Sequence, residues 1–225
     1  MPDNRALLTL AAIVAAAAIA GCGGDSSASS TAAAPTGPTA VQGCSLERPP
    51  APREMSWDAE PAMTIDPAKT YVATMQTSCG TMNITLDAKN APHTVNNFVF
   101  LAREGFYDGV PFHRIISGFM AQGGDPTGTG GGGPGYEFAD EPPSRAYEVG
   151  DLAMANAGPD TNGSQFFVIT GPQGSALPPS YNLFGKVTNG QDVVQRLDQL
   201  GDVNADNGVP PRQPVYITKV TITEK

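Results

Sequence analysis

Hydrophobic and polar residues alternate in two neighbouring segments near the middle of the chain. Residues 70–76 and 81–86 are rich in β-branched and apolar residues, and the intervening Ser78–Gly80 has the composition of a turn. This pattern predicts an antiparallel hairpin. Residues 215–223 alternate in the same way, so a further strand is expected at the C-terminal end.

Two other segments carry hydrophobic residues at helical spacing. Pro92 opens the first, which ends at Gly105, and the second follows Gly190. Short apolar segments between these points predict strands near residues 111–116, 119–122, 151–155, 165–170 and 183–187. About eight short strands with two helices predict a mainly β fold: a closed eight-stranded antiparallel β-barrel capped by two α-helices.

The N-terminal pattern is different. Ala6–Ala20 is an apolar run of 15 residues, shorter than the roughly 20 that a membrane-spanning helix needs. Its length is typical of a signal peptide. The run Ala18-Ile-Ala-Gly-Cys22 resembles the lipobox of bacterial lipoproteins, in which cleavage precedes a cysteine that becomes lipid-modified. We therefore expect a signal peptide over residues 1–21 and a lipidated Cys22. A plain secretory signal with a chance cysteine is the alternative.

Composition changes abruptly after Cys22. Residues 23–43 are almost entirely Gly, Ser, Ala, Thr and Pro, which cannot bury enough apolar surface to fold, so residues 22–43 are expected to form a flexible tether. Residues 44–68 are rich in proline but include Trp57, and this segment is expected to be pinned to the domain if a disulfide holds it. The folded domain is expected over residues 69–225.

The charge and the cysteines narrow the function further. The 225 residues have a net charge of −9, which argues against a nucleic-acid-binding protein because such a protein presents a basic face. Of the three cysteines, Cys22 is assigned to the lipid. Outside the cytoplasm Cys44 and Cys79 are expected to form a disulfide. Two free thiols are the alternative.

The candidate chemistry lies in segments 112–125, 154–167 and 177–187. In the first, the expected strand places Arg114 on the same side as Phe112 and Ile116. A guanidinium beside phenyl rings and the Gln122 amide makes a dry pocket with directed donors and no nucleophile. In the second segment, alternation allows only one of two adjacent phenylalanines, 166 and 167, to face such a groove.

Other kinds of site fit the sequence poorly. Only two histidines are present, His93 and His113, with no paired acidic cluster, so neither a metal nor another cofactor is expected. The glycine-rich run 125–135 lacks the Lys-Ser/Thr that follows a phosphate-binding loop. We interpret it as a surface loop.

Segments 112–125, 154–167 and 177–187 resemble those of the cyclophilin family of peptidyl-prolyl cis–trans isomerases, and the resemblance covers about residues 70–224. It implies that Arg114, Phe119 and Gln122 are catalytic, with Arg114 donating a hydrogen bond to the twisted proline nitrogen. It also implies a substrate-binding groove. The groove residues are His113, Met120, Ala155, Asn156, Gln165, Phe167, Leu177 and Tyr181.

Two positions depart from the family pattern. Ala176 stands where many members have a tryptophan that contributes to cyclosporin binding, and Tyr181 stands where many have histidine. A tyrosine still supplies a ring and a hydroxyl at the rim of the groove, so the catalytic assignment holds.

The resulting hypothesis is an exported isomerase, tethered to the extracytoplasmic side of the membrane by Cys22, that assists the folding of proline-containing polypeptides. A closed barrel without a long apolar helix stripe favours a monomer. A proline-peptide binding module or chaperone with incidental catalysis is the second hypothesis, and a surface adhesin is a third. The Arg114–Phe119–Gln122 constellation favours the enzyme, because a pure binder does not need the arginine donor.

Overall fold

The structure is a computed structural model that describes residues 41–202 and 210–225. All of these residues belong to the unit Gly37–Lys225. The expected signal peptide, Cys22 and most of the expected tether lie outside the described residues. Within the described part, no helix is both long enough and apolar enough to cross a membrane.

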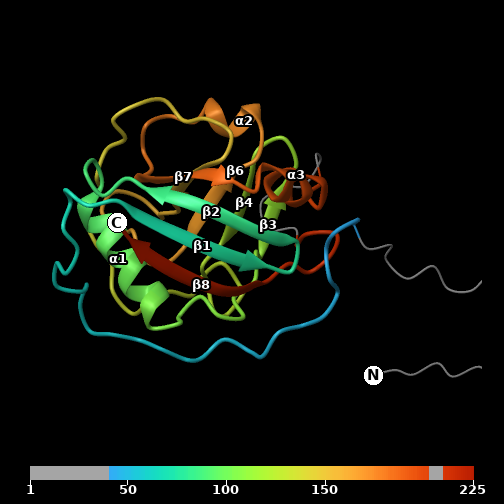
Figure 1. Ribbon diagram of the computed structural model, residues 1–225, viewed down its shortest axis with the longest axis horizontal. Coiled ribbons are helices and arrows are strands. Elements are labelled where there is room, and N and C mark those ends of the chain that lie inside the picture. Colours follow the sequence, from blue (N-terminus) through green and yellow to red (C-terminus); the bar gives the residue numbers. More distant parts are fainter. Residues whose placement is uncertain (1–40, 203–209) are drawn as a thin grey trace, which may run out of the picture. The chain divides into compact units, whose positions relative to one another are not determined.

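Eight antiparallel strands form one sheet in the order β3-β4-β6-β5-β7-β2-β1-β8 (Figure 1). All eight strands expected from the sequence are present. Their bounds are Tyr71–Thr77 (β1), Gly80–Leu86 (β2), Arg114–Ile116 (β3), Met120–Gly123 (β4), Asp151–Met154 (β5), Phe166–Ile169 (β6), Leu183–Asn189 (β7) and Ile217–Glu224 (β8).

The expected hairpin joins β1 to β2 residue by residue, from Tyr71 opposite Leu86 to Thr77 opposite Gly80. Alternate residues of both strands are buried, as their hydrophobic pattern requires. Gly80 begins β2 at φ 122°, a backbone conformation that only glycine adopts without strain. The positive φ at this turn therefore explains why glycine occupies position 80.

The expected closure of the barrel is wrong, because the sheet is open between β3 and β8. The chain before β3 approaches the chain before β8 at one isolated bridge, between Pro111 and Tyr216. Backbone N–H groups of Gly109 and Phe112 donate to carbonyls of residues 215–217. Proline has no N–H and cannot continue a ladder, and β3 is only three residues long. Hydrogen bonds therefore connect the segments that lead into the two edge strands, but β3 and β8 do not pair with each other.

Three helices occur in the described residues, one more than expected. The two expected helices are α1 (Pro92–Arg103) and α3 (Gln191–Gln199). The third, α2 (Pro172–Ser175), has only four residues, too few to show a helical period in the sequence. Proline occupies the first turn of both α1 and α2, where its missing N–H has no intrahelical partner to lose.

Buried hydrophobic residues form two separate clusters. The main core lies between the sheet and α1 and includes the rings of Phe98, Phe166 and Phe184. The second, smaller cluster lies on the other side of β4 and β6. Its buried members are Met120, Tyr147, Ala153, Phe167, Ile169 and Leu183, and the half-buried residues Ile116, Phe119, Ala155, Leu177 and Tyr181 pack against them.

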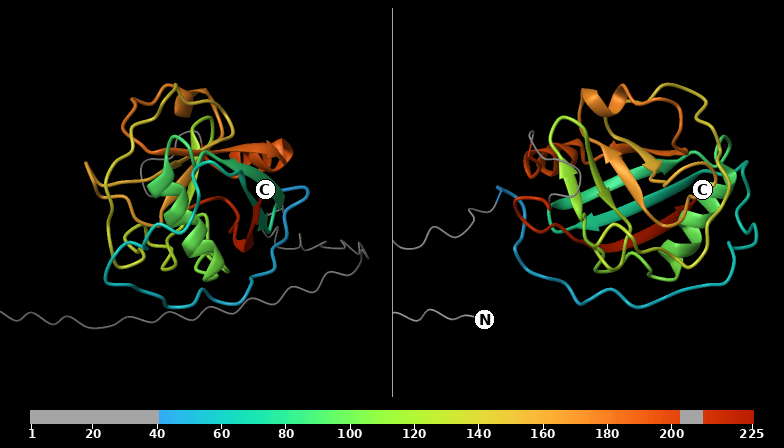
Figure 2. Two further views of the ribbon diagram at one scale, coloured as in Figure 1. Left: turned by 60° about the vertical axis from the view of Figure 1, so that its left-hand side comes forward. Right: turned by 180° about the vertical axis from the view of Figure 1, so that it is seen from behind.

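Residues 44–66, which we call the N-terminal strap, run along the outside of the domain past α1 (Figures 1 and 2). A disulfide joins Cys44 to Cys79, as expected. Further along, the Trp57 ring packs edge-on against Phe100 of α1 with centroids 5.1 Å apart, and the Thr64 N–H donates to Asn96 of the same helix at 2.9 Å. The strap is thus pinned at several points, as the cysteine pairing predicts.

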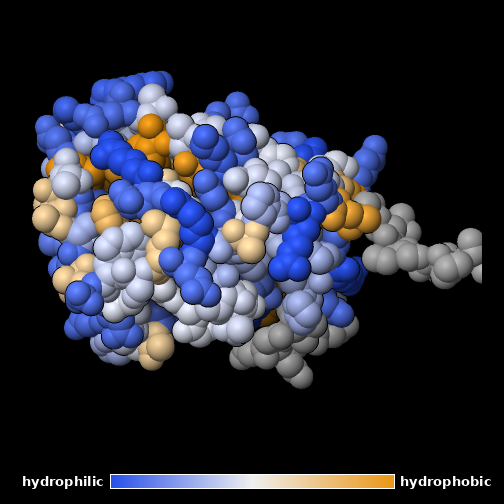
Figure 3. Space-filling view, turned by 90° about the horizontal axis from the view of Figure 1, so that it is seen from below, coloured by the Kyte–Doolittle hydropathy of each residue, from blue (hydrophilic) through white to orange (hydrophobic). Residues whose placement is uncertain are grey.

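The face seen from below in Figure 3 carries hydrophilic side chains with small hydrophobic patches between them. Within the strap, Ile65 is buried in the main core and Trp57 and Met55 pack against that core, whereas Leu46 and Met63 are exposed. The strap therefore extends the hydrophobic core beyond the sheet and α1.

Candidate active site

Arg114 and Gln122 lie opposite each other on the neighbouring strands β3 and β4. Arg114 Nη1 donates to Gln122 Oε1 at 3.0 Å, and Gln122 Nε2 donates to Gln165 Oε1 at 3.0 Å. Gln165 in turn donates to the carbonyl oxygens of Gly130 and Gly132, both at 2.9 Å. This chain of bonds fixes the plane of the guanidinium and the orientation of both amides.

The second hydrophobic cluster brings together the four residues expected to form the proline pocket. Met120 and Phe167 are buried, while Phe119 and Leu177 are half-buried and reach the surface. Met120 begins β4, and Phe167 pairs with Gln122 across β4 and β6. Since strand residues alternate in direction, Phe166 enters the main core and Phe167 the second cluster. Phe167 is thus the member of the pair that lies with Met120, Phe119 and Leu177.

Tyr181 closes one side of this cluster. Its ring meets the Phe167 ring edge-on, with centroids 5.4 Å apart. Burial lowers the pKa of Arg114 below its ordinary value, and the nearby Tyr181 phenol opposes this shift. Arginine nevertheless remains protonated at any physiological pH. The site thus presents a permanent cation beside an apolar surface and an aromatic rim.

Two cavities adjoin Gln122. One, of about 620 Å³, is lined by His113, Arg114 and Gln122 together with residues 128–130 and Pro210. The other, of about 660 Å³, is lined by Gln122, Ala155, Asn156 and Gln165, by the glycine-rich residues 130–135 and by neighbouring residues. The expected groove residues outside the apolar cluster therefore line these two cavities, which share Gln122.

His113 is half-buried between charged neighbours. Burial lowers the pKa of His113, the Asp125 carboxylate opposes that shift and the Arg114 guanidinium adds to it. The imidazole is therefore neutral at neutral pH. A neutral ring here leaves Arg114 as the cationic side chain next to Gln122.

The glycine-rich run is more than the surface loop that the sequence suggests. Burial alone would raise the pKa of Asp125, but hydrogen bonds from Thr127, Gly132 and Gly130 outweigh it and lower the pKa. The Asp125 carboxylate also accepts the Thr129 N–H at 3.0 Å. These bonds shape the loop into a wall of the larger cavity. Aspartate followed by threonine two and four residues later is the sequence signal for such a turn.

Phe112 is not placed as expected. It enters the main core and packs on Phe166, whereas Ile116 joins the second cluster. The strict alternation used in the prediction fails because β3 begins only at Arg114. Before that point the Phe112 N–H bonds to the Val215 carbonyl, which turns the phenyl ring inward.

Asn156, which lines the larger cavity, connects two neighbouring segments of the chain. Its side-chain Nδ2 donates to the Ser180 carbonyl at 3.0 Å, and the N–H of the preceding Ala155 donates to the Gln165 carbonyl at 2.9 Å.

In residues 41–202 and 210–225, no three His, Cys, Asp or Glu side chains lie close enough together to hold a metal ion. The described site therefore offers hydrogen-bond donors, apolar surface and one guanidinium.

Comparison with known proteins identifies the family to which this chain belongs. The family model for cyclophilin type peptidyl-prolyl cis-trans isomerases matches residues 72–222. Peptidyl-prolyl cis-trans isomerase A of Mycobacterium tuberculosis is 43% identical over 181 residues, covering 72% of this chain and 97% of its own. Peptidyl-prolyl cis-trans isomerase-like 1 of Mus musculus is 46% identical over 156 residues, covering 67% and 92%.

Solved structures agree with this result. The crystal structure of a cyclophilin type isomerase from Cryptosporidium parvum superimposes with a TM-score of 0.62 at 34% identity, covering 68% of this chain and 98% of the other. A second structure of that protein, in the presence of the dipeptide Ala-Pro, gives a TM-score of 0.61. The family match spans nearly all of the sheet, from the second residue of β1 into β8, together with α1 and all of the expected groove residues. The chain described here therefore belongs to the cyclophilin family of peptidyl-prolyl cis–trans isomerases.

Proposed function

We propose that Arg114 is the catalytic donor of this isomerase and that the second hydrophobic cluster holds the substrate proline. The observation that carries the proposal is the bonded series Arg114–Gln122–Gln165 beside that cluster. A guanidinium fixed in this way can aim N–H groups at one point above an apolar pocket. The groove would accept the ring of proline, and the bonded amides would face the peptide chain.

The chemistry that this geometry supplies is stabilisation of a twisted amide. Rotation about an X–Pro bond must cross about 18–20 kcal/mol, because amide resonance is lost on the way. At the twisted geometry the proline nitrogen becomes pyramidal and regains its lone pair. A donor aimed at that lone pair stabilises the twisted state more than either planar state, which is the requirement for catalysis.

Burial of the site strengthens this effect. Met120 and Phe167 are 2% and 4% exposed, respectively, so a proline ring seated on them displaces water from the reacting bond. A hydrogen bond in such a dry environment is stronger than in water. Gln122 and the Asn156 backbone would hold the substrate carbonyl and chain, with His113, Ala155 and Gln165 lining the groove. No bond between heavy atoms breaks, so no nucleophile or cofactor takes part.

We further propose that the enzyme acts outside the cytoplasm, attached to the membrane through a lipidated Cys22, as a monomer. The lipobox-like run ending at Cys22 supports this proposal, and two acyl chains on one cysteine would make the attachment stable. The Cys44–Cys79 disulfide also supports it, because structural disulfides persist in oxidising compartments. The biological substrates would be exported polypeptides whose folding waits for X–Pro rotation.

The attachment is tested by expressing the full chain in a bacterial host and separating the membranes. Wild-type protein is expected in the membrane fraction and labelled by radioactive palmitate. Cys22→Ala should lose the label and appear in the soluble fraction, whereas Cys44→Ala should keep the label. Equal labelling and equal membrane association of wild type and Cys22→Ala would contradict the lipid anchor.

The folding role is tested on a disulfide-free protein whose slow refolding phase is limited by X–Pro isomerisation, a process of tens to hundreds of seconds. The enzyme is expected to accelerate that phase in proportion to its concentration. Excess Ala-Pro peptide should suppress the acceleration by occupying the groove. An unchanged slow phase at equimolar enzyme would count against a folding role.

A further inference from the structure

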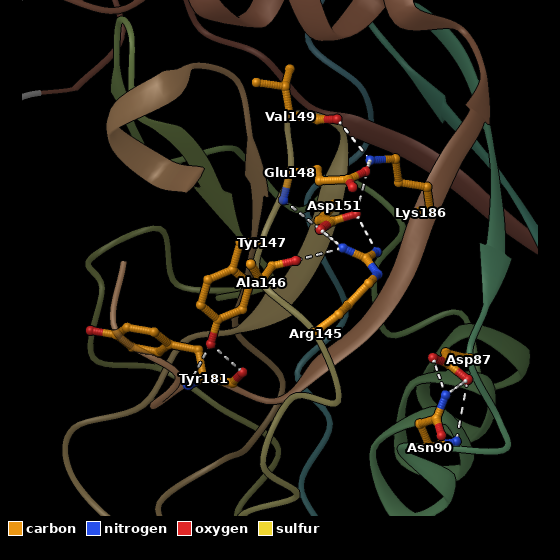
Figure 4. A network of polar contacts seen from close by, with 10 residues as sticks. All are labelled: Asp87, Asn90, Arg145, Ala146, Tyr147, Glu148, Val149, Asp151, Tyr181 and Lys186. Carbon is orange, nitrogen blue, oxygen red and sulfur yellow. Dashed lines mark hydrogen bonds and ion pairs between the residues drawn. The ribbon is translucent and has the colours of Figure 1, made fainter. Parts of the chain in front are cut away.

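Tyr147 lies behind the groove, where no role is assigned to it by the proposed mechanism. It is 4% exposed and belongs to the second hydrophobic cluster, beside Phe167 and Leu183. Its hydroxyl makes two hydrogen bonds to one residue: it donates to the Tyr181 carbonyl at 2.8 Å and accepts the Tyr181 N–H at 3.0 Å (Figure 4). A single side-chain group thus satisfies both backbone polar groups of Tyr181.

The chain around Tyr181 needs such a partner. Residues 176–182 lie between α2 and β7 and form neither helix nor strand, so no ladder supplies their backbone bonds. Within this segment Ser180 bonds to Pro178 and to Asn156. A buried backbone group without a partner is costly, and the Tyr147 hydroxyl supplies the bonds that a neighbouring strand would otherwise make.

Tyr147 is itself firmly held. The carboxylate of Asp151, whose side chain is fully buried, accepts two bonds from Arg145 at 2.7 and 2.8 Å. The same carboxylate accepts the Glu148 N–H at 2.7 Å and lies 3.2 Å from Lys186 Nζ of β7. Figure 4 shows this network and the Tyr147 ring reaching from it toward Tyr181. The segment that carries Tyr147 is therefore fixed to the sheet on both sides.

Tyr181 in turn touches the groove. Its ring packs edge-on against Phe167, and its phenol lies close enough to Arg114 to affect the pKa of that guanidinium. A shift of the Tyr181 backbone would move an aromatic ring across the place where the proline pocket meets the arginine donor. The position of Tyr181 thus bears on how a substrate is held.

We propose that Tyr147 is a positioning residue that fixes the rim residue Tyr181 against the substrate groove through both of its hydrogen bonds. The proposal rests on the groove assignment made above. Tyr147 does not touch substrate and acts only through the backbone of Tyr181. Its contribution is to substrate binding, which is equally present in the planar and twisted states, rather than to the twisted state alone.

The test variant is Tyr147→Phe, which removes the hydroxyl and keeps the ring in the cluster. With a chromogenic Ala-Pro tetrapeptide, KM is expected to rise about three- to tenfold, the range that loss of a hydrogen bond produces, while kcat stays within about twofold. In a Tyr181→Ala background the same substitution should raise KM less than about twofold, because the rim ring is already gone. A KM rise that persists undiminished in that background would overturn the proposal.

Tyr71→Phe is the matched control. Tyr71 is also a buried tyrosine, and its hydroxyl accepts the N–H of Asp66 in the strap at 2.9 Å. Its loss is expected to lower the melting temperature without changing KM. If Tyr147→Phe instead lowers the melting temperature as Tyr71→Phe does and leaves KM unchanged in an active enzyme, Tyr147 is merely structural and the proposal fails.

A second readout does not depend on activity. In the wild-type chain the Tyr181 amide is expected to exchange its hydrogen with solvent slowly, at a rate like those of the neighbouring β7 amides, and at least tenfold faster in Tyr147→Phe. Fast exchange in the wild type would overturn the inference directly. Slow exchange that becomes fast in Tyr147→Phe, together with an unchanged KM, would show that the two bonds exist but do not position the rim, and the proposal would fail. The groove assignment itself would fail only if Phe167→Ala also left KM unchanged.

Discussion

Adjacent residues in β6 serve different parts of the molecule. The ring of Phe166 meets those of Phe98, Tyr107 and Phe184 in the main core, whereas Phe167 contacts Tyr181 in the second hydrophobic cluster. Strand alternation explains this division. The sequence alone predicts that only one of these two phenylalanines faces away from the main core. It does not show which one, because both are apolar and the answer depends on which side of β6 the core occupies.

Replacing Phe166 or Phe167 with alanine is expected to affect different properties of the protein. Phe166→Ala is expected to lower the free energy of unfolding by about 3–5 kcal/mol, the usual cost of deleting a fully buried ring, with a small effect on KM of the folded protein. Phe167→Ala is expected mainly to raise KM for a proline peptide. Urea denaturation and isomerisation assays on both variants measure the two effects. The reverse pattern would contradict the placement of the groove.

His113 gives a prediction for pH dependence. Because burial lowers its pKa in the folded state, the unfolded chain takes up a proton first as pH falls below about 6.5. Stability should therefore decline between pH 6.5 and the lowered folded pKa. His113→Gln should remove this part of the decline. Denaturation curves at pH 7.5, 6.5 and 5.5 test this prediction. An equal loss of unfolding free energy with falling pH in wild type and His113→Gln would contradict it.

At the scale of elements, the strap and the glycine-rich loop support each other. The Trp57 N–H donates to the Pro134 carbonyl at 2.9 Å. Gly135 next to it has φ +94°, and a Cβ there would lie 2.1 Å from Ser56 Oγ and 2.7 Å from the Trp57 carbonyl. The loop wall of the larger cavity thus rests directly on a segment that precedes the isomerase domain in sequence.

This contact is tested with two neighbouring glycines. Gly135→Ala is expected to lower the free energy of unfolding by about 1–3 kcal/mol, because it strains the backbone and pushes against the strap. Gly133→Ala, where a Cβ would meet nothing within 4 Å, should change it by less than about 0.5 kcal/mol. Urea denaturation followed by the fluorescence of Trp57, the only tryptophan, measures both. Equal effects would contradict the contact.

Elements with a clear hydrophobic period could be predicted from sequence. The eight strands and the longer helices α1 and α3 appear where alternation or helical spacing indicates them. The open edge between β3 and β8 could not, because it depends on how Pro111 meets a distant strand. The role of the glycine-rich loop was likewise hidden, since glycines carry no side chains and the cavity wall they form depends on the buried Asp125 carboxylate.

Some residues of the candidate site could likewise be predicted from the sequence, and others could not. The resemblance supplied Arg114, Gln122 and the apolar pocket, and the structure brings these residues into one region. Tyr147 could not be found in this way, because it lies in a segment with no distinctive pattern. Only the three-dimensional arrangement reveals its two bonds to Tyr181.

For the whole molecule, the disulfide is expected to be a main source of stability. It closes a loop between residues 35 apart in sequence, for which chain entropy predicts a stabilisation of about 4 kcal/mol. The double variant Cys44→Ala/Cys79→Ala should therefore unfold at a markedly lower urea concentration than the wild type. The reduced wild type should behave like the variant. A midpoint unchanged by reduction would show that the strap is held by its other contacts alone.

The central claim is that Arg114 stabilises the twisted X–Pro bond. The most direct measurement is a protease-coupled isomerisation assay on an Ala-Pro peptide, with peptide affinity measured in parallel. Arg114→Ala is expected to reduce kcat/KM about 100-fold or more, as loss of a preorganised donor does, and to change peptide affinity only a few-fold. Arg103→Ala, a surface arginine of α1, serves as the control and should match the wild type. An Arg114→Ala variant with wild-type kcat/KM would contradict the account.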